Sequence, residues 1–430
     1  MKKPRISPPD KNNYGVRQMI SSRRKANNNN KAARHESNPR FRKKNSVFFY
    51  TPVISNGPIT PKEALTNYSF FLNSYERNEI MYYPDIYYLG ISHRKIIPNE
   101  DESANFGFDQ DDFHYNLISG DHLAYRYEII SLYGIGAFGQ VVRCYDHKLK
   151  MNVAVKMIIN TEQMHQQGVI EAQILSRLNE AKVRHVVSAY DYFIFRRHIC
   201  ISFEVLSFNL YQLIEHNNFG AFPIPKVKLI SIQILSALEQ CHRLGIVHCD
   251  IKPENVSLND GSDSFVKLID FGSSCIVGNN VYEYIQSRYY RAPEVILGIK
   301  YGPPMDIWSF SLIIIEMLIG KPLFQGESEL EMLSLISQLI GPPPQELVES
   351  GSRKNEFFDE NLDLLPENQQ KLNISWGNIT EDNDLINLLQ NSLTWDQNCR
   401  ITARDALKHP WVRSFKIVKS KNSSVLPYLK

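Results

Sequence analysis

His248-Cys249-Asp250-Ile251-Lys252-Pro253-Glu254-Asn255 is the stretch of this 430-residue chain that decides its fold. It supplies a carboxylate, an ammonium group and a carboxamide in the pattern H-x-D-x-K-x-x-N. A second carboxylate follows twenty residues after Asp250, in Asp270-Phe271-Gly272, directly behind an apolar run. A positioned carboxylate can take up a proton, and a hard cation such as Mg²⁺ prefers oxygen ligands. The two motifs at this offset indicate phosphoryl-transfer chemistry.

A glycine-rich segment lies upstream, Gly134-Ile135-Gly136-Ala137-Phe138-Gly139. Alone, this GxGxxG pattern is weak, because in a dinucleotide-binding fold it joins a strand to a helix. Here the next six residues, Gln140 to Tyr145, have the pattern of another strand, so we expect a β-hairpin. Glycine lets the backbone approach phosphate groups that side chains would block. An ordinary glycine-rich hairpin is the alternative if no other motif accompanies it.

Lys156 ends the apolar segment Val153-Ala154-Val155-Lys156, seventeen residues after Gly139. A lysine inside an apolar strand is costly to bury without an acidic partner. Glu171, in the helical segment that follows, is well placed to be that partner, whereas Glu162 lies near the start of the helix. Taken alone, Lys156 would be interpreted as a strand-end lysine whose ammonium group reaches water.

Three later residues are suited to structural support. Glu294 closes the tripeptide Ala292-Pro293-Glu294, and Arg400 is suited to form a buried ion pair with it. Asp306 opens a segment that is apolar nearly all round, as expected of a central buried helix. We expect Asp306 to brace the backbone of the loop that contains Asp250.

In this order the motifs resemble those of the eukaryotic protein kinases, over residues 127–411. The resemblance implies an α+β, bilobal protein kinase fold, with a β-rich N-lobe, a helical C-lobe and an N-terminal accessory region packed on the N-lobe. It also implies ATP and Mg²⁺ as cofactors. The implied catalytic residues are Asp250, Lys252, Lys156 and Glu171, and the implied metal ligands are Asn255 and Asp270. The implied ATP-binding residues are Tyr133, Gly134, Ile135, Gly136, Ala137, Phe138, Gly139, Gln140, Val141, Ala154, Lys156, Phe203, Glu204, Val205 and Leu206.

Further segments resemble the dual-specificity tyrosine-regulated kinases, the DYRK family of the CMGC group. They are the segment Tyr282-Glu283-Tyr284-Ile285-Gln286-Ser287-Arg288-Tyr289-Tyr290-Arg291, the His-Cys-Asp of the catalytic loop, Phe203 to Leu210 at the predicted hinge, and Asp121 to Tyr127. The acidic stretch Asp109–Asp112 resembles the DH box of that family. The aromatic block Thr60–Gly90 is similar to the accessory region of its class 2 members.

The resemblance implies a protein kinase that acts on Ser and Thr of protein substrates and autophosphorylates Tyr284 once, during maturation. A phosphate on Tyr284 would carry nearly two negative charges, and Arg288 and Arg291 follow it in the sequence. Many kinases read such a phosphate with an arginine before the catalytic aspartate, but Cys249 holds that place here. We therefore predict that Arg288 and Arg291 bind the phosphotyrosine.

Three positions depart from the family pattern. Tyr133 replaces a small aliphatic residue before the first glycine, which changes the wall above adenine. Ser257 stands where an aliphatic residue is expected below adenine. Phe310-Ser311 replaces Leu-Gly in the buried helix, where we expect only a change in packing. None of these replacements removes a reacting group.

The chain divides into four predicted regions. Residues 1–47 form a disordered basic tail, 48–126 the accessory region with its DH-box-like segment, 127–411 the kinase domain, and 412–430 a short C-terminal tail. In the accessory region, Thr60 is the predicted N-cap of a helix. An apolar stripe follows, formed by Leu65, Tyr68, Phe71, Leu72, Tyr75 and Ile80. Residues 99–114 are acidic and polar and are predicted to be a linker.

Elements are also predicted within the kinase domain. We expect strands at 127–132, 141–145, 153–159, 186–195 and 199–203, a helix at 163–178, and mostly helices after Leu206. Val227, Ile230, Ile234, Leu238 and Cys241 mark one face of a helix.

Charge and cysteine content bound the location and partners. Residues 1–47 hold 14 Lys and Arg against Asp10 and Glu36, although the whole chain has a net charge of only +2. We favour a solvated arm over a nucleic-acid or membrane contact, so no specific nucleic acid is expected. Six widely spaced cysteines and the lack of an apolar leader predict a cytoplasmic protein, and the basic clusters allow nuclear import as well. We expect a monomer without membrane insertion.

Two other functional classes compete with an active kinase. A pseudokinase scaffold would bind partners through the same fold, but such proteins typically lack the lysine or one of the aspartates that this chain retains. A nucleic-acid-binding protein rests only on the basic tail. A neighbouring CMGC subgroup is the alternative within the kinase interpretation.

Overall fold

The computed structural model describes the chain over residues 53–54, 57–99, 102–259, 261–262, 264–278, 285–366, 371–372 and 374–415. The predicted tail of residues 1–47, Tyr284 and all but the first four residues of the predicted C-terminal tail lie outside these residues. The chain divides into two units, residues 1–50 and 51–430, and everything described below belongs to the second unit.

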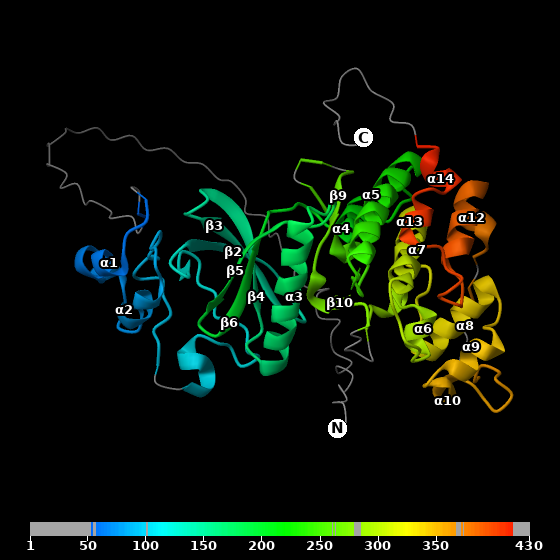
Figure 1. The fold of residues 1–430 in the computed structure, drawn as a ribbon, viewed down its shortest axis with the longest axis horizontal. Coiled ribbons are helices and arrows are strands. Elements are labelled where there is room, and N and C mark those ends of the chain that lie inside the picture. The colour runs from blue at the N-terminus through cyan, green and yellow to red at the C-terminus, as the bar shows by residue number, and fades with distance from the viewer. Residues whose placement is uncertain are drawn as a thin grey trace, which may run out of the picture. The chain divides into compact units, whose positions relative to one another are not determined.

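A six-stranded antiparallel sheet forms the first part of the kinase domain, in the strand order β1-β2-β3-β4-β6-β5 (Figure 1). Along β4, Val153 and Val155 are buried on one face, and Lys156 projects from the other. Helix α3 (Glu162–Glu180) follows, with Thr161 as its N-cap, and packs on the side of Lys156. The strands are β1 (His122–Leu123), β2 (Tyr127–Gly136), β3 (Gly139–Asp146), β4 (Met151–Ile158), β5 (Ala189–Phe195) and β6 (His198–Phe203).

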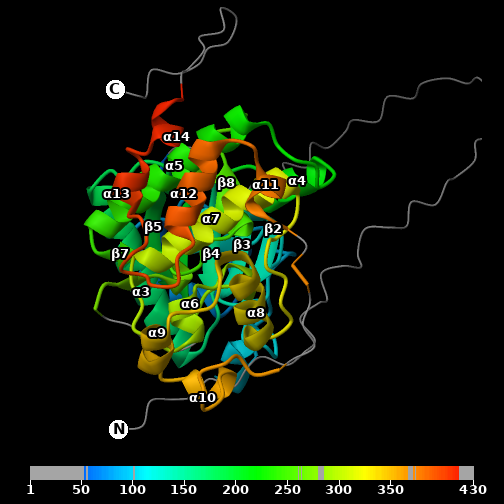
Figure 2. The same ribbon diagram turned by 90° about the vertical axis from the view of Figure 1, so that its right-hand side faces the viewer.

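The second part of the domain is helical and is built around α7 (Pro304–Ile319), in which every side chain from Met305 to Leu318 is buried. Helix α5 (Ile224–Arg243) packs on α7 and buries all five residues of its predicted face. Helix α12 (Asn383–Ser392) also contacts α7 (Figure 2). Among the described helices, none has the length and apolar character needed to cross a bilayer.

Shorter elements complete the helical lobe. Two small antiparallel pairs lie beside the cleft: β7 (Ile246–Val247) with β10 (Cys275–Ile276), and β8 (Val256–Leu258) with β9 (Val266–Leu268). The remaining helices are α4 (Leu210–His216), α6 (Pro293–Ile296), α8 (Glu329–Ile340), α9 (Gln345–Ser350), α10 (Lys354–Phe357), α11 (Trp376–Ile379), α13 (Ala403–Ala406) and α14 (Pro410–Arg413).

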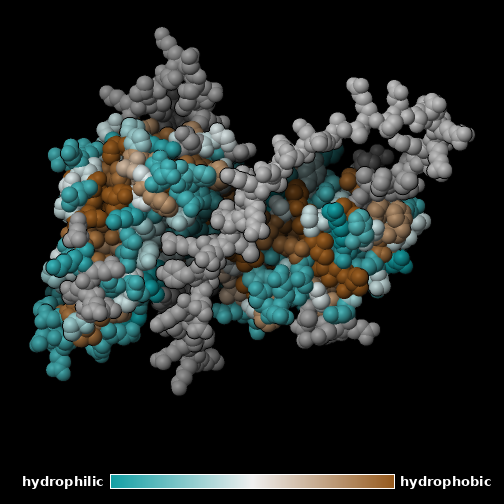
Figure 3. Space-filling view, turned by 180° about the vertical axis from the view of Figure 1, so that it is seen from behind, coloured by the Kyte–Doolittle hydropathy of each residue, from teal (hydrophilic) through white to brown (hydrophobic). Residues whose placement is uncertain are grey.

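The predicted bilobal α+β fold is confirmed, with small differences at the ends of strands. β2 reaches Gly136 and β3 begins at Gly139, so the glycine-rich motif lies in a β-hairpin, as predicted. β5 begins at Ala189 and not at Val186, because Val186 pairs with Leu268 outside the sheet. Apolar side chains gather on the surface of the strand-rich part on the side that Figure 3 shows.

The accessory region begins with the predicted helix. Thr60 and Glu63 form a reciprocal capping box at the start of α1 (Pro61–Asn67). The apolar stripe beyond it does not form one helix. Asn73 interrupts it, because its side-chain oxygen accepts a hydrogen bond from the backbone N–H of Glu76 and starts a new helical turn, α2 (Glu76–Glu79). Two 3₁₀ turns, Ser69–Phe71 and Ile80–Tyr82, flank that break.

The prediction of a linker over residues 99–114 is wrong. Phe108 is fully buried, and Asp109 bridges to Tyr115 in a short hairpin. The Asp109 carboxylate accepts hydrogen bonds from the side chains of Asn105 and Asn160 and contacts His198. Polarity suggested solvent exposure, but here the polar groups satisfy one another in a buried site.

This segment covers the outer face of the sheet. Phe108 and Tyr115 pack in one cluster with Val142, Val155 and Cys200, on the face opposite Lys156. Figure 1 shows the helices of the accessory region on the far side of the sheet from α3. The central strands β4 and β6 are therefore largely covered on both faces, which explains their apolar residues, whereas β2 and β5 keep exposed side chains.

Arg196 anchors this contact from the turn between β5 and β6. Its guanidinium donates to both carboxylate oxygens of Glu79 at 3.0 Å and to Glu76 at 3.3 Å. Burial works against the charge of Glu76, but the hydrogen bond with His122 and the charges of Lys95 and Arg196 hold its pKa below the ordinary value. Arg196 is 7% exposed and adopts φ 46°, a left-handed conformation that costs energy in an arginine and that these contacts offset.

We expect Arg196→Met to lower the free energy of unfolding by about 3–5 kcal/mol, because it removes the buried cation that pairs with the largely buried Glu79 and leaves Glu76 with Lys95 as its counter-charge. The midpoint of thermal unfolding measures this loss. The neighbouring Arg197 is exposed and serves as a matched control, since Arg197→Met should cost less than about 1 kcal/mol. Equal effects of the two substitutions would contradict the anchoring role.

Candidate active site

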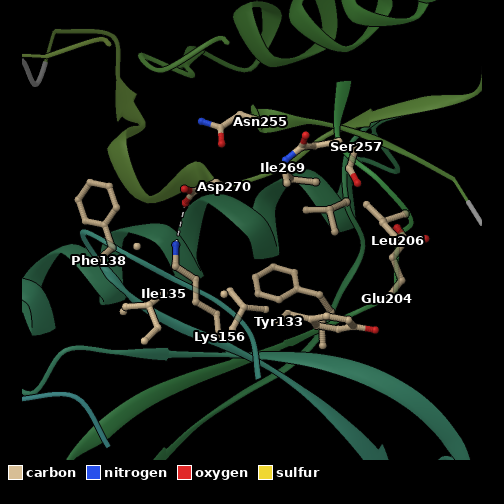
Figure 4. A pocket seen from close by; sticks show the side chains of 18 of the residues that line it. Tyr133, Ile135, Phe138, Lys156, Glu204, Leu206, Asn255, Ser257, Ile269 and Asp270 are labelled. Atoms are coloured by element: carbon tan, nitrogen blue, oxygen red, sulfur yellow. Dashed lines mark hydrogen bonds and ion pairs between the residues drawn. The ribbon is translucent and has the colours of Figure 1, made fainter. Parts of the chain in front are cut away.

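A cavity of about 640 Å³ lies between the sheet and the helical lobe. Figure 4 shows Lys156 and Asp270 at one end of it and Tyr133, Glu204 and Leu206 at the other. Thirteen of the fifteen predicted ATP-binding residues line it, and Glu171, Asn255 and Asp270 line it as well. The thirteen are Tyr133, Gly134, Ile135, Gly136, Ala137, Phe138, Gly139, Val141, Ala154, Lys156, Phe203, Glu204 and Leu206.

Gln140 and Val205 do not line the cavity. Successive side chains of a strand point to opposite faces, so Gln140 turns away where Val141 turns inward. The Nε2 atom of Gln140 donates to the backbone carbonyl of Tyr115 at 2.9 Å and so joins β3 to the accessory region. The Gln140 side chain therefore does not reach the cavity, and a contact of this residue with ATP through its backbone stays a prediction. Val205 does not line the cavity either, although its two neighbours in the chain, Glu204 and Leu206, do.

Several lining residues were not assigned from the sequence: Val187, Ser207, Phe208, Asn209, Gln212 and Ile269. Ser207, Phe208 and Asn209 lie within the predicted hinge segment, Phe203 to Leu210, and Gln212 lies two residues beyond it, so assigning the whole segment to the cavity would have found three of them. Ile269 directly precedes Asp270 and was identifiable by its position. Val187 carries no sequence signal, because only the pairing of its backbone with that of Leu268 brings it to the cavity.

The pairing predicted for Lys156 is confirmed. Its Nζ atom lies 2.7 and 2.9 Å from the two carboxylate oxygens of Glu171 and 2.8 Å from Oδ1 of Asp270. These side chains come from β4, α3 and the loop after β9. A Cβ atom at Gly272 would lie 3.1 Å from both Nζ and Oδ1, so glycine leaves room for this contact.

One ammonium group thus serves two carboxylates, and the pKa values of the three groups follow. Burial works against the charge of Lys156, but Asp270 and Glu171 raise its pKa above the ordinary value. Burial also disfavours the charge of Asp270, yet Lys156 lowers the pKa of that carboxyl. For Glu171 burial prevails and raises the pKa. Asp270 is therefore the carboxylate that holds its charge more firmly.

Asp250 lies in a second cluster beside the cavity. Ser287 donates to Oδ1 through its backbone N–H at 3.2 Å and its hydroxyl at 3.0 Å. The Nζ atom of Lys252 lies 2.7 Å from Oδ2, and Asn255 donates to the same oxygen at 3.0 Å. The three predicted residues therefore converge. Ser287, which was not assigned from the sequence, belongs to the activation segment, residues 270–295, and connects that segment to Asp250.

The backbone of this loop is braced from below, as predicted. Asp306 accepts hydrogen bonds from the backbone N–H groups of His248 and Cys249, each at 2.9 Å. Cys249 has φ 66°, a strained conformation for a residue with a side chain. The buried carboxylate of Asp306 holds that conformation and so sets the direction of Asp250.

The predicted ion pair at the end of the activation segment is also confirmed. The guanidinium of Arg400 binds the two carboxylate oxygens of Glu294 at 2.7 and 3.0 Å, and both side chains are fully buried. A bidentate pair in this setting fixes geometry as well as charge.

The two predicted phosphotyrosine-binding arginines contact the start of α8 and the residues just before it. Arg291 is buried; it donates to the backbone carbonyls of Ile285 and Gln286 and lies 2.6 Å from a carboxylate oxygen of Glu329. Arg288 is exposed and donates to the backbone carbonyl of Glu327. Tyr284 lies outside the described residues, so the binding of a phosphate on Tyr284 by these two arginines stays a prediction.

A carboxyl group with a displaced pKa lies under the activation segment. The hydroxyl of Tyr290 donates to Glu316 at 2.6 Å. Burial raises the pKa of Glu316 to about 7, and the charge of Glu254 adds to this effect while the hydrogen bond from Tyr290 opposes it. Glu316 therefore changes its charge near neutral pH.

Comparisons with known proteins agree with this site. The protein kinase domain family matches residues 127–412. Dual specificity tyrosine-phosphorylation-regulated kinase 3 of Rattus norvegicus is 39% identical over 385 residues, which cover 83% of this chain and 65% of the relative. Kinase 4 of the same name from Homo sapiens is 37% identical over 374 residues, which cover 84% of this chain and 72% of the relative. The DYRK-family kinase pom1 of Schizosaccharomyces pombe is 39% identical over 82% of this chain and 34% of its own length.

The raised pKa of Glu316 predicts a pH-dependent stability. Between its unfolded value near 4.5 and its folded value of about 7, the folded protein binds more protons, so stability falls as the pH rises through this range. Glu316→Gln cannot ionise, and we expect it to gain about 1–3 kcal/mol relative to the wild type between pH 5 and pH 8. Urea unfolding at the two pH values measures the difference.

The exposed Glu215 provides the control, because Glu215→Gln should leave the dependence on pH as in the wild type. A Glu316→Gln variant whose stability depends on pH as the wild type does would contradict the assignment.

Proposed function

Because this chain belongs to the dual-specificity tyrosine-phosphorylation-regulated kinases, a family of protein kinases, we propose that it transfers the γ-phosphate of ATP to Ser and Thr of protein substrates. The observation that carries this proposal is the contact of Lys156 with both Glu171 and Asp270. It supports the proposal because a cation held in this way can bind phosphate oxygens at one end of the cavity, while the hinge segment, Phe203 to Leu210, lines the end that would take the nucleotide base.

The residues present suit ATP and Mg²⁺. Asp270 and Asn255 offer a carboxylate and a carboxamide oxygen at the cavity, which are the ligand types that Mg²⁺ prefers. One oxygen of Asp270 is engaged by Lys156 and the backbone N–H of Gly272. When bound, Mg²⁺ would supply positive charge to the phosphate oxygens. Asn255 also donates to Asp250, so the same side chain joins the two clusters.

Asp250 is the proposed base for the hydroxyl of the substrate. Its carboxylate is held by donors from Ser287, Lys252 and Asn255, which fix its orientation. Burial works against the charge of Lys252, but Asp250 raises the pKa of its ammonium group above the ordinary value. Lys252 thus stays positive beside Asp250 and is placed to stabilise charge on the transferred phosphoryl group.

We further propose that the chain autophosphorylates Tyr284, which the names of its relatives suggest. In the described structure Arg291 is paired with Glu329. A phosphate on Tyr284 would carry more charge than a carboxylate and would compete for this arginine. Arg288 is exposed and accessible to the same phosphate.

Asp250→Asn should reduce phosphate incorporation into a basic protein substrate by about 10²- to 10⁴-fold, because an amide cannot accept the proton. Incubation of the purified protein with radiolabelled ATP and Mg²⁺ measures this rate. Asp405 is exposed and distant from the cavity, so Asp405→Asn makes the same chemical change without loss of activity. Phosphate incorporation that persists in Asp250→Asn would contradict the role assigned to Asp250. A wild-type protein that binds nucleotide but transfers no phosphate would be a scaffold and not an active kinase.

Mass spectrometry of the recombinant protein tests the maturation step. The wild type should carry one phosphate on Tyr284, and Tyr284→Phe should lack it and show a reduced rate on Ser and Thr substrates. Asp250→Asn should also lack the phosphate if the modification is intramolecular and not the work of the expression host. A fully active wild type with unmodified Tyr284 would overturn the proposal.

A further inference from the structure

Two side chains, Tyr133 and Ser257, lie on opposite walls of the cavity, at the end that would take the nucleotide base. Both depart from the residue that the family pattern has at that position. Tyr133 belongs to β2 and lies on the wall formed by the sheet, with 48% of its surface exposed. Ser257 belongs to β8 and lies on the opposite wall, where it is 4% exposed. Figure 4 shows the two residues on opposite sides of the cavity, near Leu206.

The wall at Ser257 offers little apolar surface to a bound base. The Ser257 hydroxyl donates to the backbone carbonyl of Ser207 at 3.1 Å, so its hydrogen-bonding capacity as a donor is already used by the hinge segment. What remains toward the cavity is small. An aliphatic residue at this position would supply several additional methylene and methyl groups of contact.

The wall at Tyr133 has the opposite character. The pairing of β2 with β3 shifts register between Leu132 and Gly134, which leaves Tyr133 as the extra residue of a β-bulge. A bulge redirects a side chain out of the regular alternation of its strand, and such bulges occur beside active sites. Here the bulge brings an aromatic ring to the lining of the cavity.

We propose that Tyr133 stacks on the base of the bound nucleotide and that the small Ser257, on the opposite wall, leaves the room that a base stacked on this ring requires. The inference rests on the proposed function, since it takes ATP as the ligand of the cavity. Tyr133 and Ser257 act as a pair: an aromatic ring on one side takes over the contact that an aliphatic side chain would make on the other. The two residues together set the affinity for the base.

The physical reason lies in the shape of the groups. Nucleotide bases are flat, and stacking on an aromatic side chain uses a whole face of the base without requiring a hydrogen bond. A small residue on the opposite wall leaves room for a base that the ring of Tyr133 displaces toward that wall. A bulky aliphatic residue at position 257 would narrow the space between the two walls and crowd a base stacked on Tyr133, so the effect of either residue depends on the other.

Calorimetric titration with ADP and Mg²⁺ tests this inference. Tyr133→Leu should weaken ADP binding by roughly 3- to 10-fold because it removes the stacking face, whereas Tyr133→Phe keeps the ring and should lose less than about twofold. Tyr192 is an exposed tyrosine on β5 that does not line the cavity, and Tyr192→Leu controls for the loss of a surface ring.

The double variant decides whether the residues act as a pair. Ser257→Leu should weaken or leave unchanged the binding of ADP in the wild type, but it should strengthen binding in the Tyr133→Leu background. An equal effect of Ser257→Leu in both backgrounds, or unchanged affinity in Tyr133→Leu, would overturn the inference. Thermal unfolding of each variant confirms that the fold is retained.

The ADP titration measures binding and does not depend on phosphate transfer. The stacking proposal and the proposed kinase activity can therefore be contradicted independently of each other. Loss of stacking by Tyr133→Leu in a protein that transfers no phosphate would support the inference and contradict the proposed kinase activity. In an active enzyme, Tyr133→Leu should raise the KM for ATP while kcat stays near its wild-type value. A lowered kcat with unchanged KM would contradict the stacking role.

Discussion

The rest of the site depends on one ammonium group, that of Lys156, which is shared between Glu171 and Asp270. These three residues come from a strand, a helix and a loop, so their contact fixes the relative positions of three elements at once. A buried carboxylate such as that of Glu171 is costly without a counter-charge, which the lysine supplies. Lys156 also lowers the pKa of Asp270, a proposed metal ligand, whereas burial raises the pKa of Glu171.

The accessory region extends this constraint outward. Asp109 accepts a hydrogen bond from the side chain of Asn160, and the backbone N–H of Asn160 donates to the carbonyl of Phe113. Asn160 lies just before α3, the helix that holds Glu171. A segment outside the kinase domain thus contacts the turn from which the catalytic helix begins. Arg196 and Gln140 attach the same region to the sheet, so the N-lobe and its cover form one packed body.

Some of these contacts were predictable and others were not. The pairs Lys156–Glu171 and Arg400–Glu294 were both predicted from the sequence. Lys156 lies in an apolar strand and requires an acidic partner, and the order of the kinase-like motifs pointed to the pairing of Arg400 with Glu294. The direction of the Gln140 side chain, away from the cavity, was not predicted, because a motif marks a stretch of residues and does not separate the two faces of a strand. The prediction of a linker over residues 99–114 was wrong, because composition alone does not show whether polar groups form hydrogen bonds with one another or with water.

By itself, the sequence determined the reacting groups, their order and the two lobes, since strand alternation, helix periodicity and motif spacing are short-range properties of the chain. Only the tertiary structure decided that the accessory region buries the outer face of the sheet, that Arg291 pairs with Glu329, and that a bulge turns Tyr133 toward Ser257. These contacts join residues distant in the sequence or depend on register. Packing and desolvation select among many possible partners there, and no local pattern records the choice.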